Sequence, residues 1–344
     1  MSEVVMKRRR ALLFVNAGLI LIIIVVIAIS IGPGLSINRL PHLIMSAMGG
    51  GDEGFENAIL SYRVIRVLLA VITGFVLSYC GATLQITLNN PLADPYLLGL
   101  SAGAGFGASL SSALSLVIAI PGLTSKMVFA FIGGVLAVFG VYRISRIRRS
   151  GGAQTIIITG IIVSSFLSAA IIFMLAIAPF RDQHQILLWL LGDLSSPVIT
   201  IKHIVVVGII AIAALVGLIV KHRELDILSG GEEQALYLGV SVEVSRRYIF
   251  TLTALATGAV VSLTGLIGFI GIVVPHASRA IIGPQARRLL PFSALVGGIT
   301  LLTADTISRI LVTYFPIPTI PVGVITAFFG APYFLYVFTK GRRD

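Results

Sequence analysis

Charged residues and cysteine are both scarce in this sequence. Asp, Glu, Lys and Arg together make up 11% of the 344 residues, whereas roughly 25% is usual in a soluble domain. A surface this poor in charge excludes an ordinary soluble fold. Cys80 is the only cysteine, so the chain can form no internal disulfide. Because Cys80 lies in an apolar run, we interpret it as a small packing residue.

Sequence motifs for metal-dependent catalysis and nucleotide binding are missing as well. There is no H-E-x-x-H, no cluster of Cys and His at metal-ligand spacing and no G-x-x-x-x-G-K-[ST] phosphate loop. The apolar runs also contain few ionisable residues, which intramembrane enzymes and ion-coupled carriers place at mid-depth. We therefore predict a chain that is not an enzyme and binds no metal or cofactor of its own. A secondary ion-coupled carrier and an intramembrane enzyme are the less favoured alternatives.

Apolar residues, in contrast, make up 57% of the sequence and give a mean hydropathy of +1.03. A bilayer core about 30 Å thick requires roughly 20 apolar residues for each helical span. Ten segments are apolar enough, near residues 11–31, 62–87, 95–119, 124–142, 153–178, 200–220, 247–263, 267–281, 288–311 and 322–339. We therefore predict an all-α, polytopic membrane protein in which residues 1–344 form a single transmembrane domain. The first segment is too long for a signal peptide, so we interpret it as a retained helix.

The basic residues are distributed unequally along this path. The net charge is +11, but most Lys and Arg lie between apolar runs, as the positive-inside rule describes, so we do not expect nucleic acid as a partner. With ten helices, one side of the membrane receives eighteen Lys and Arg residues. The other side receives seven, which are Arg39, Arg63, Arg66, Lys126, Arg181, Lys202 and Arg309. We therefore predict that the richer side and both chain termini are cytoplasmic.

The longest loop on the predicted cytoplasmic side extends from Lys221 to Arg247. Within it, Gly230-Gly231-Glu232-Glu233 precedes apolar residues at roughly helical spacing, which are Ala235, Leu236, Leu238 and Val240. This pattern predicts one or two short surface helices. Glu232 and Glu233 would then lie at a helix N-terminus, where the helix dipole favours negative charge. The alternative is a solvated loop.

Charged residues flank apolar segments on the opposite side. Arg63 and Arg66 are three residues apart and share one helical face. They could anchor the helix at the membrane interface or form a docking patch for an acidic partner. Asp305 and Arg309 are four residues apart, which favours an internal ion pair over a second part of such a patch. We interpret His276 as a packing or capping group, not as a metal ligand.

Specific motifs are spread between Tyr62 and Tyr336. They are Arg63-x-x-Arg66, NNPLADP from Asn89, LGLSxGA from Leu98, WLLG from Trp189, GLIGFxG from Gly265 with Val274-Pro275-His276, Ala304-Asp305-x-x-x-Arg309, and PVGVIT from Pro321 with Gly330-Ala331-Pro332. As a set, these motifs resemble the permeases of the iron-chelate, haem and cobalamin ABC importers. The resemblance covers almost the whole chain.

The resemblance implies a cobalamin-permease-like fold of the type II ABC importers, in the cytoplasmic membrane of a prokaryote. Two copies of the chain would form a homodimer around one translocation path. Each copy would bind a cytoplasmic ABC ATPase, which would hold ATP and Mg²⁺, and an external substrate-binding protein would deliver the cargo. The expected cargo is a metal chelate, with a ferric siderophore or another iron complex favoured and haem or cobalamin as alternatives.

The resemblance also implies three functional sites. The coupling segment for the ATPase is residues 226–241, with Gly231, Glu232, Ala235, Leu238 and Gly239 as its principal residues. The docking residues Arg63, Arg66 and Arg309 would meet acidic residues on the binding protein, where charge complementarity guides encounter. Asn90 and Leu92 match the cytoplasmic gate.

Overall fold

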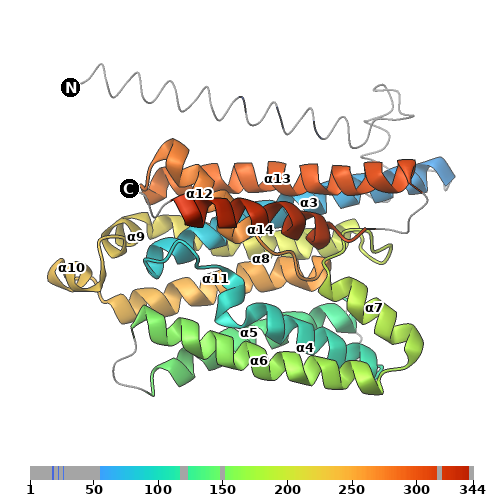
Figure 1. Cartoon of the computed structure of the whole chain (residues 1–344), viewed down its shortest axis with the longest axis horizontal. Helices are drawn as coiled ribbons and strands as arrows, with labels where there is room; N and C mark the ends of the chain where they lie inside the picture. The colour runs from blue at the N-terminus through green and yellow to red at the C-terminus, as the bar shows by residue number, and fades with distance from the viewer. Residues whose placement is uncertain are drawn as a thin grey trace.

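The computed structural model describes residues 55–116, 123–147, 152–315 and 320–340, together with residues 18, 22 and 26. Within these ranges the chain forms twelve α-helices and one short 3-10 helix. They are α3 (Phe55–Thr87), η2 (Pro95–Leu98), α4 (Leu100–Ala113), α5 (Ser125–Ser145), α6 (Ala153–Ile177), α7 (Phe180–Leu190), α8 (Ile201–Val220), α9 (His222–Leu228), α10 (Glu232–Tyr237), α11 (Val242–Thr264), α12 (Ile270–Ile282), α13 (Ala286–Tyr314) and α14 (Val322–Lys340). The long helices form a bundle with α9 and α10 at one end and α7 at the other (Figure 1). We refer to these as the α10 end and the α7 end.

The helices correspond to the apolar segments predicted from the sequence. Nine of the ten segments coincide with α3, η2 plus α4, α5, α6, α8, α11, α12, α13 and α14. The first segment, 11–31, lies outside the described residues except for residues 18, 22 and 26. Among the described helices, α3, α5, α6, α8, α11 and α13 are long and apolar enough to cross a membrane, and α12 and α14 are shorter apolar helices. The predicted all-α polytopic class is confirmed.

The loop between α8 and α11 contains two short helices, as its apolar spacing predicted. α10 begins directly after Gly231, and Glu232 and Glu233 occupy its first turn. Figure 1 shows α9 and α10 projecting beyond the ends of the long helices. The loop is therefore not irregular throughout, although most residues of α10 are exposed. The short helix α7 at the opposite end was not predicted.

Glycine allows the central helices to approach one another closely. α3 packs along α13, and α4 packs along α5. A Cβ atom added at Gly74 of α3 would lie 2.3 Å from the carbonyl oxygen of Gly297 in α13, and one at Gly103 of α4 would lie 2.3 Å from that of Gly133 in α5. These distances are far inside van der Waals contact, so a larger residue cannot enter without moving the helices apart. Cys80 of α3 is fully buried, as expected for a packing residue.

Burial differs strongly between the spanning helices. Within the most apolar window of each helix, 78% of the α3 residues are buried, against 22% of the α6 residues. The exposed face of α6 includes Ile162, Phe166 and Phe173. α3 is therefore the centre of the bundle, whereas one face of α6 is available to lipid or to another protein chain.

A non-helical segment, residues 265–269, separates α11 from α12. Gly265 and Phe269 both have φ of 69°, a backbone conformation that interrupts the helix. The Ile267 N–H donates to the Tyr96 hydroxyl at 3.0 Å, and the Leu266 N–H donates to the carbonyl of Trp189 at 3.4 Å. Such partners are required where non-helical backbone lies inside a membrane protein. They connect this turn to η2 and α7.

Candidate functional sites at the two ends of the bundle

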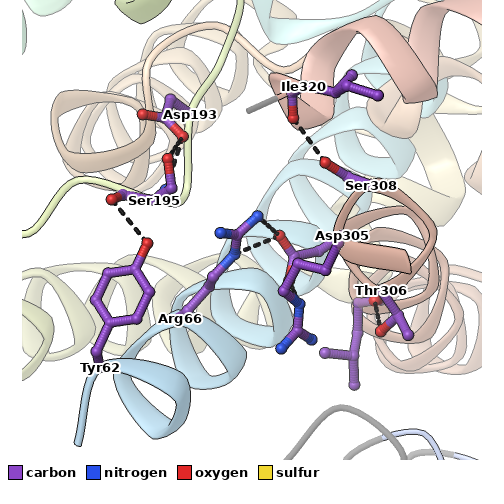
Figure 2. A network of polar contacts seen from close by, with 10 residues as sticks. Tyr62, Arg66, Asp193, Ser195, Asp305, Thr306, Ser308 and Ile320 are labelled. Atoms are coloured by element: carbon purple, nitrogen blue, oxygen red, sulfur yellow. Dashed lines mark hydrogen bonds and ion pairs between the residues drawn. The ribbon is translucent and has the colours of Figure 1, made fainter. Parts of the chain in front are cut away.

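At the α7 end, Arg66 of α3 and Asp305 of α13 form a buried ion pair (Figure 2). The Nε and Nη2 atoms of Arg66 both lie 2.8 Å from Oδ1 of Asp305. The two side chains are 9% and 0% exposed. Removing one partner of such a pair leaves a buried charge uncompensated. We therefore interpret this pair as a structural link between α3 and α13.

Arg309 shares the same carboxylate. Its Nε lies 3.1 Å from Oδ2 of Asp305, which confirms the internal ion pair expected from their spacing. The Arg309 side chain is 23% exposed, and Arg63 is also partly exposed. Of the three predicted docking residues, Arg63 and Arg309 therefore reach the surface, whereas Arg66 is buried. Among the described residues, the guanidinium groups of Arg63, Arg66 and Arg309 lie with the carboxylate of Asp305, so the charges of these four side chains sum to a positive value; we call these four residues the arginine cluster.

The loop after α7 lies beside the arginine cluster. The Tyr62 hydroxyl donates to the carbonyl oxygen of Ser195 at 2.8 Å, and Asp193 accepts from the Ser195 N–H at 2.7 Å and from its hydroxyl (Figure 2). On the other side, the Ser308 hydroxyl donates to the carbonyl of Ile320 at 2.6 Å. These contacts fix the segments that surround the cluster. Sequence spacing gave no signal for them, because Tyr62 and Ser195 are 133 residues apart.

At the α10 end, helix α10 presents apolar side chains to solvent. Leu236, Tyr237 and Leu238 are 63%, 91% and 59% exposed. Exposed apolar neighbours on a projecting element are typical of a surface that contacts another protein or a membrane. Leu238 was among the predicted coupling residues, but Leu236 and Tyr237 were not. Three consecutive apolar residues within a polar loop were the signal that could have identified them.

The other predicted coupling residues shape the helix. Gly231 and Gly239 flank α10 with φ values of 106° and 78°, which residues other than glycine rarely adopt. Ala235 is fully buried and faces the bundle. These three residues therefore set the position of α10, and its exposed side chains provide the surface.

Glu232 is bonded within the chain. Its Oε1 atom lies 2.5 Å from Nη2 of Arg246 in α11, and a Cβ atom added at Gly152, just before α6, would lie 3.9 Å from the same oxygen. The hydrogen bond from Arg246 is the main reason that the pKa of Glu232 lies below its usual range. A carboxylate at this position also complements the dipole of α6. Glu232 thus connects α10 to α11 and lies beside the start of α6.

Helix α9 is connected to two further helices. Oδ1 of Asp226 accepts a hydrogen bond from the backbone N–H of Ala286, at the start of α13, at 2.6 Å. The side-chain amide of Asn89, in the turn after α3, donates to the carbonyl of Leu228 at 3.0 Å. The predicted coupling segment, residues 226–241, is therefore hydrogen-bonded to α11, α13 and the turn after α3.

The predicted gate residues lie in the turn that follows α3. Oδ1 of Asn90 accepts a hydrogen bond from the backbone N–H of Leu92 at 2.9 Å, which is the geometry of an Asx turn. Leu92 is 37% exposed. Because the neighbouring Asn89 donates to the carbonyl of Leu228 in α9, Asn90 and Leu92 lie at the α10 end, close to α9.

The described residues contain no group of three or more His, Cys, Asp and Glu that could hold a metal ion. The pattern Gly-x-Ser-x-Gly does occur from Gly99 to Gly103, but it follows the 3-10 helix η2. In serine hydrolases the same pattern lies between a strand and a helix. Ser101 lines a recess together with Asp94, and no described histidine lines it. The pattern therefore provides no catalytic triad.

Comparison with known sequences connects this architecture to one family. The signature of the FecCD transport family matches residues 20–340. The hemin transport system permease protein HmuU of Yersinia pestis is 37% identical over 292 residues, which cover 83% of this chain and 84% of the relative. The cobalamin import system permease protein BtuC of Halobacterium salinarum is 36% identical over 292 residues, which cover 84% and 75%. The Fe(3+)-citrate import system permease protein YfmE of Bacillus subtilis is 34% identical over 340 residues, which cover 98% of each chain.

A solved structure has the same arrangement of helices. It is described as an inward-facing conformation of a metal-chelate type ABC transporter. The match has a TM-score of 0.78 at 25% sequence identity and covers 95% of this chain and 99% of that chain.

Proposed function

The chain belongs to the FecCD transport family, and we propose that it is the membrane-spanning permease of an ABC importer for a metal chelate. The observation that carries this proposal is the difference between the two ends of the bundle. The α7 end has the arginine cluster, and at the α10 end the projecting helix α10 carries exposed apolar residues and is bonded to the spanning helix α11. A permease between an external cargo carrier and an internal motor needs both features.

In this proposal the α10 end faces the cytoplasm. Of the described Lys and Arg residues, the larger group lies at the α10 end, which includes Arg143, Arg146, Lys221, Arg246 and Arg288. This bias is the one that the positive-inside rule predicts for cytoplasmic loops. The chain is then a multi-pass protein of the cytoplasmic membrane with both termini inside the cell.

A separate ABC ATPase binds the exposed residues Leu236, Tyr237 and Leu238. That subunit binds ATP and Mg²⁺ and hydrolyses the nucleotide, so this chain is a transport subunit and not an enzyme. Glu232 transmits the movement of α10 to α6 and α11, and Asp226 transmits the movement of α9 to α13. The hydrogen bonds described above support this role because they join the coupling segment to spanning helices.

Two copies of the chain enclose one cargo path, with one ATPase under each copy. The exposed serine side of α6, which includes Ser165 and Ser168, is turned toward this path. Asn90 and Leu92 form its cytoplasmic gate. Cargo moves in one direction only if the loaded binding protein and ATP favour different conformations of the permease.

An external binding protein docks on the α7 end. Arg63 and Arg309 meet acidic residues on its surface, which increases the rate of encounter and fixes the orientation. Arg66 contributes indirectly, because it holds the Asp305 carboxylate that also contacts Arg309.

A ferric siderophore or another iron complex is the proposed cargo. The alignment with the ferric citrate permease covers 98% of this chain and 98% of that relative, and it supports an iron complex as the cargo. Haem and cobalamin are the alternatives, because relatives named for these two cargoes have similar identity to this chain.

Reconstitution tests the proposal. The permease, its ATPase and its binding protein are placed in proteoliposomes, and uptake of radiolabelled ferric chelate, haemin and cobalamin is measured. We expect uptake of a ferric chelate that requires both ATP and the binding protein. Uptake by the permease without an ATPase would refute the importer. ATP-dependent uptake of haemin or cobalamin alone would refute iron as the cargo.

A further inference from the structure

A recess lined in part by serine hydroxyls lies at the middle of α6. It has a volume of about 520 Å³ and is lined from α6 by Ile161, Ser164, Ser165 and Ser168. Ser165 is the midpoint of this 25-residue helix, and Ser165 and Ser168 are both exposed. The opposite wall comes from η2, α4 and α12. Hydroxyl groups therefore gather at the depth where the surrounding surface of α6 is apolar.

Asp94 supplies a carboxylate to the same recess. Its side chain is largely buried, because the residue is only 5% exposed. Oδ1 accepts a hydrogen bond from the backbone N–H of Tyr96 at 2.7 Å, whereas Oδ2 accepts none from the described residues. A Cβ atom added at Gly271 of α12 would lie 3.0 Å from Oδ2. The glycine thus provides the space in which this oxygen sits.

This arrangement is unsuited to contact with lipid. Hydrocarbon offers no hydrogen bond to a carboxylate oxygen or to exposed hydroxyl groups, and ionisable residues within membrane proteins are therefore found facing protein or water-filled cavities. The exposed Ile162, Phe166 and Phe173 on α6 would be stable in lipid. The Ser165 hydroxyl donates to the carbonyl of Ile161 at 2.9 Å, but hydrocarbon would offer no partner to Oδ2 of Asp94 or to the hydroxyls of Ser164 and Ser168.

We propose that this recess opens onto the water-filled cargo path and binds hydrogen-bond donors of the passing chelate. Oδ2 of Asp94 accepts from an O–H or N–H group of the cargo, and the hydroxyls of Ser164 and Ser168 donate to or accept from its polar atoms. The ligand class is a hydrophilic chelate that carries hydroxyl or amide groups. The assignment rests on the proposed function, since it requires a cargo path.

Thiol labelling tests whether water reaches the recess. Ser168→Cys is compared with Ile209→Cys, which lies near the midpoint of α8 and is 65% exposed. The native Cys80 is fully buried and serves as the unreactive background. A membrane-impermeant methanethiosulfonate is applied to the complex of permease and ATPase in nanodiscs, with and without ATP.

Because a thiolate forms only where water solvates it, we expect Ser168→Cys to react roughly tenfold faster than Ile209→Cys in at least one nucleotide state. Equal and slow reaction of both variants in both states would overturn the proposal. This measurement needs no transport. The wild-type uptake assay therefore tests the importer separately.

Asp94→Asn tests whether Oδ2 of Asp94 accepts a hydrogen bond from the cargo. The amide retains one oxygen for the Tyr96 N–H but presents an NH₂ group in place of Oδ2, so it can no longer accept from the cargo. We expect uptake of the ferric chelate to fall roughly tenfold, while ATPase activity stimulated by the binding protein persists. Unchanged uptake would overturn the role of Asp94. If the variant fails to assemble, Ser168→Val provides the same comparison, because it removes a hydroxyl from an exposed position.

Discussion

Glu232 and Arg246 are fourteen residues apart in the sequence, and their side chains meet at 2.5 Å in the structure. This contact joins α10, the helix that projects from the bundle, to the spanning helix α11. Glu232 also lies beside the start of α6, since a Cβ atom added at Gly152 would lie 3.9 Å from its Oε1 atom. The neighbouring Glu233 is exposed and offers a matched control with the same chemistry.

We therefore predict that Glu232→Gln uncouples transport from ATP hydrolysis. The complex should still assemble, because the exposed residues of α10 are unchanged. The chelate transported for each ATP hydrolysed should fall several-fold, on the order of the 1 kcal/mol that a partly exposed ion pair contributes. Glu233→Gln should behave as wild type. Equal effects of the two variants in a coupled uptake and ATPase assay would contradict the role of Glu232.

The same contact predicts a dependence on pH. The pKa of Glu232 in the folded chain lies below its usual value of 4.5, chiefly because of the hydrogen bond from Arg246. The Glu232–Arg246 contact therefore contributes fully to the free energy of unfolding above pH 4.5. This contribution is lost as the pH falls through the lower pKa that Glu232 has in the folded chain. Thermal unfolding of wild type and Glu232→Gln in detergent should differ at neutral pH and converge in acid. A difference in thermal stability between the two proteins that grows in acid would contradict a lowered pKa of Glu232.

The arginine cluster predicts different effects for two arginines that lie one turn apart. Arg66→Gln should lower the stability of the permease by about 3 kcal/mol, because it breaks a buried ion pair with Asp305. Arg63→Glu lies at the surface and should cost less than about 1 kcal/mol, but it should abolish stimulation of the ATPase by the binding protein. Chemical unfolding and stimulated ATPase activity measure the two properties. Equal stability of the two variants would contradict the burial of Arg66, and normal stimulation in Arg63→Glu would contradict docking at this end.

The helix crossing at Gly74 predicts a steric effect. Gly74→Ala places a Cβ atom 2.3 Å from the carbonyl oxygen of Gly297, so α3 and α13 must separate, at a cost of about 1–3 kcal/mol. Gly208→Ala in α8 is the control, because nothing lies within 4 Å of its added Cβ atom. It should be neutral or stabilising by up to about 1 kcal/mol. Thermal unfolding compares the two variants, and equal stability would contradict the close crossing.

The helices were predictable from the sequence because each spanning segment is a long apolar run. Helix α10 was also predictable, since Gly231, two acidic residues and an apolar spacing mark its start. The exception is α7, an eleven-residue helix that carries Arg181, Asp182 and His184. Its mixed polarity resembles that of a surface connection, so hydropathy gave no signal.

The contacts within the sites were less predictable. Asp305 and Arg309 share one helix, so their spacing predicted an ion pair. Arg66 lies 239 residues from Asp305, and nothing in its local sequence distinguishes it from Arg63. Which arginine is buried depends on how α3 and α13 cross. Likewise, the motif from Gly265 to Gly271 was identified only as a resemblance, and its packing against Trp189 and Asp94 required the structure.

The side of the membrane on which each end lies decides whether α10 can reach a cytoplasmic ATPase. Arg63→Cys and Tyr237→Cys place one thiol at each end of the bundle, and the buried Cys80 supplies no background. A membrane-impermeant maleimide is applied to intact cells or spheroplasts and then to permeabilised ones. We predict that Arg63→Cys is labelled from outside, whereas Tyr237→Cys is labelled only after permeabilisation. Labelling of Tyr237→Cys in intact cells would place α10 outside the cell, beyond the reach of any cytoplasmic ATPase, and would contradict the account.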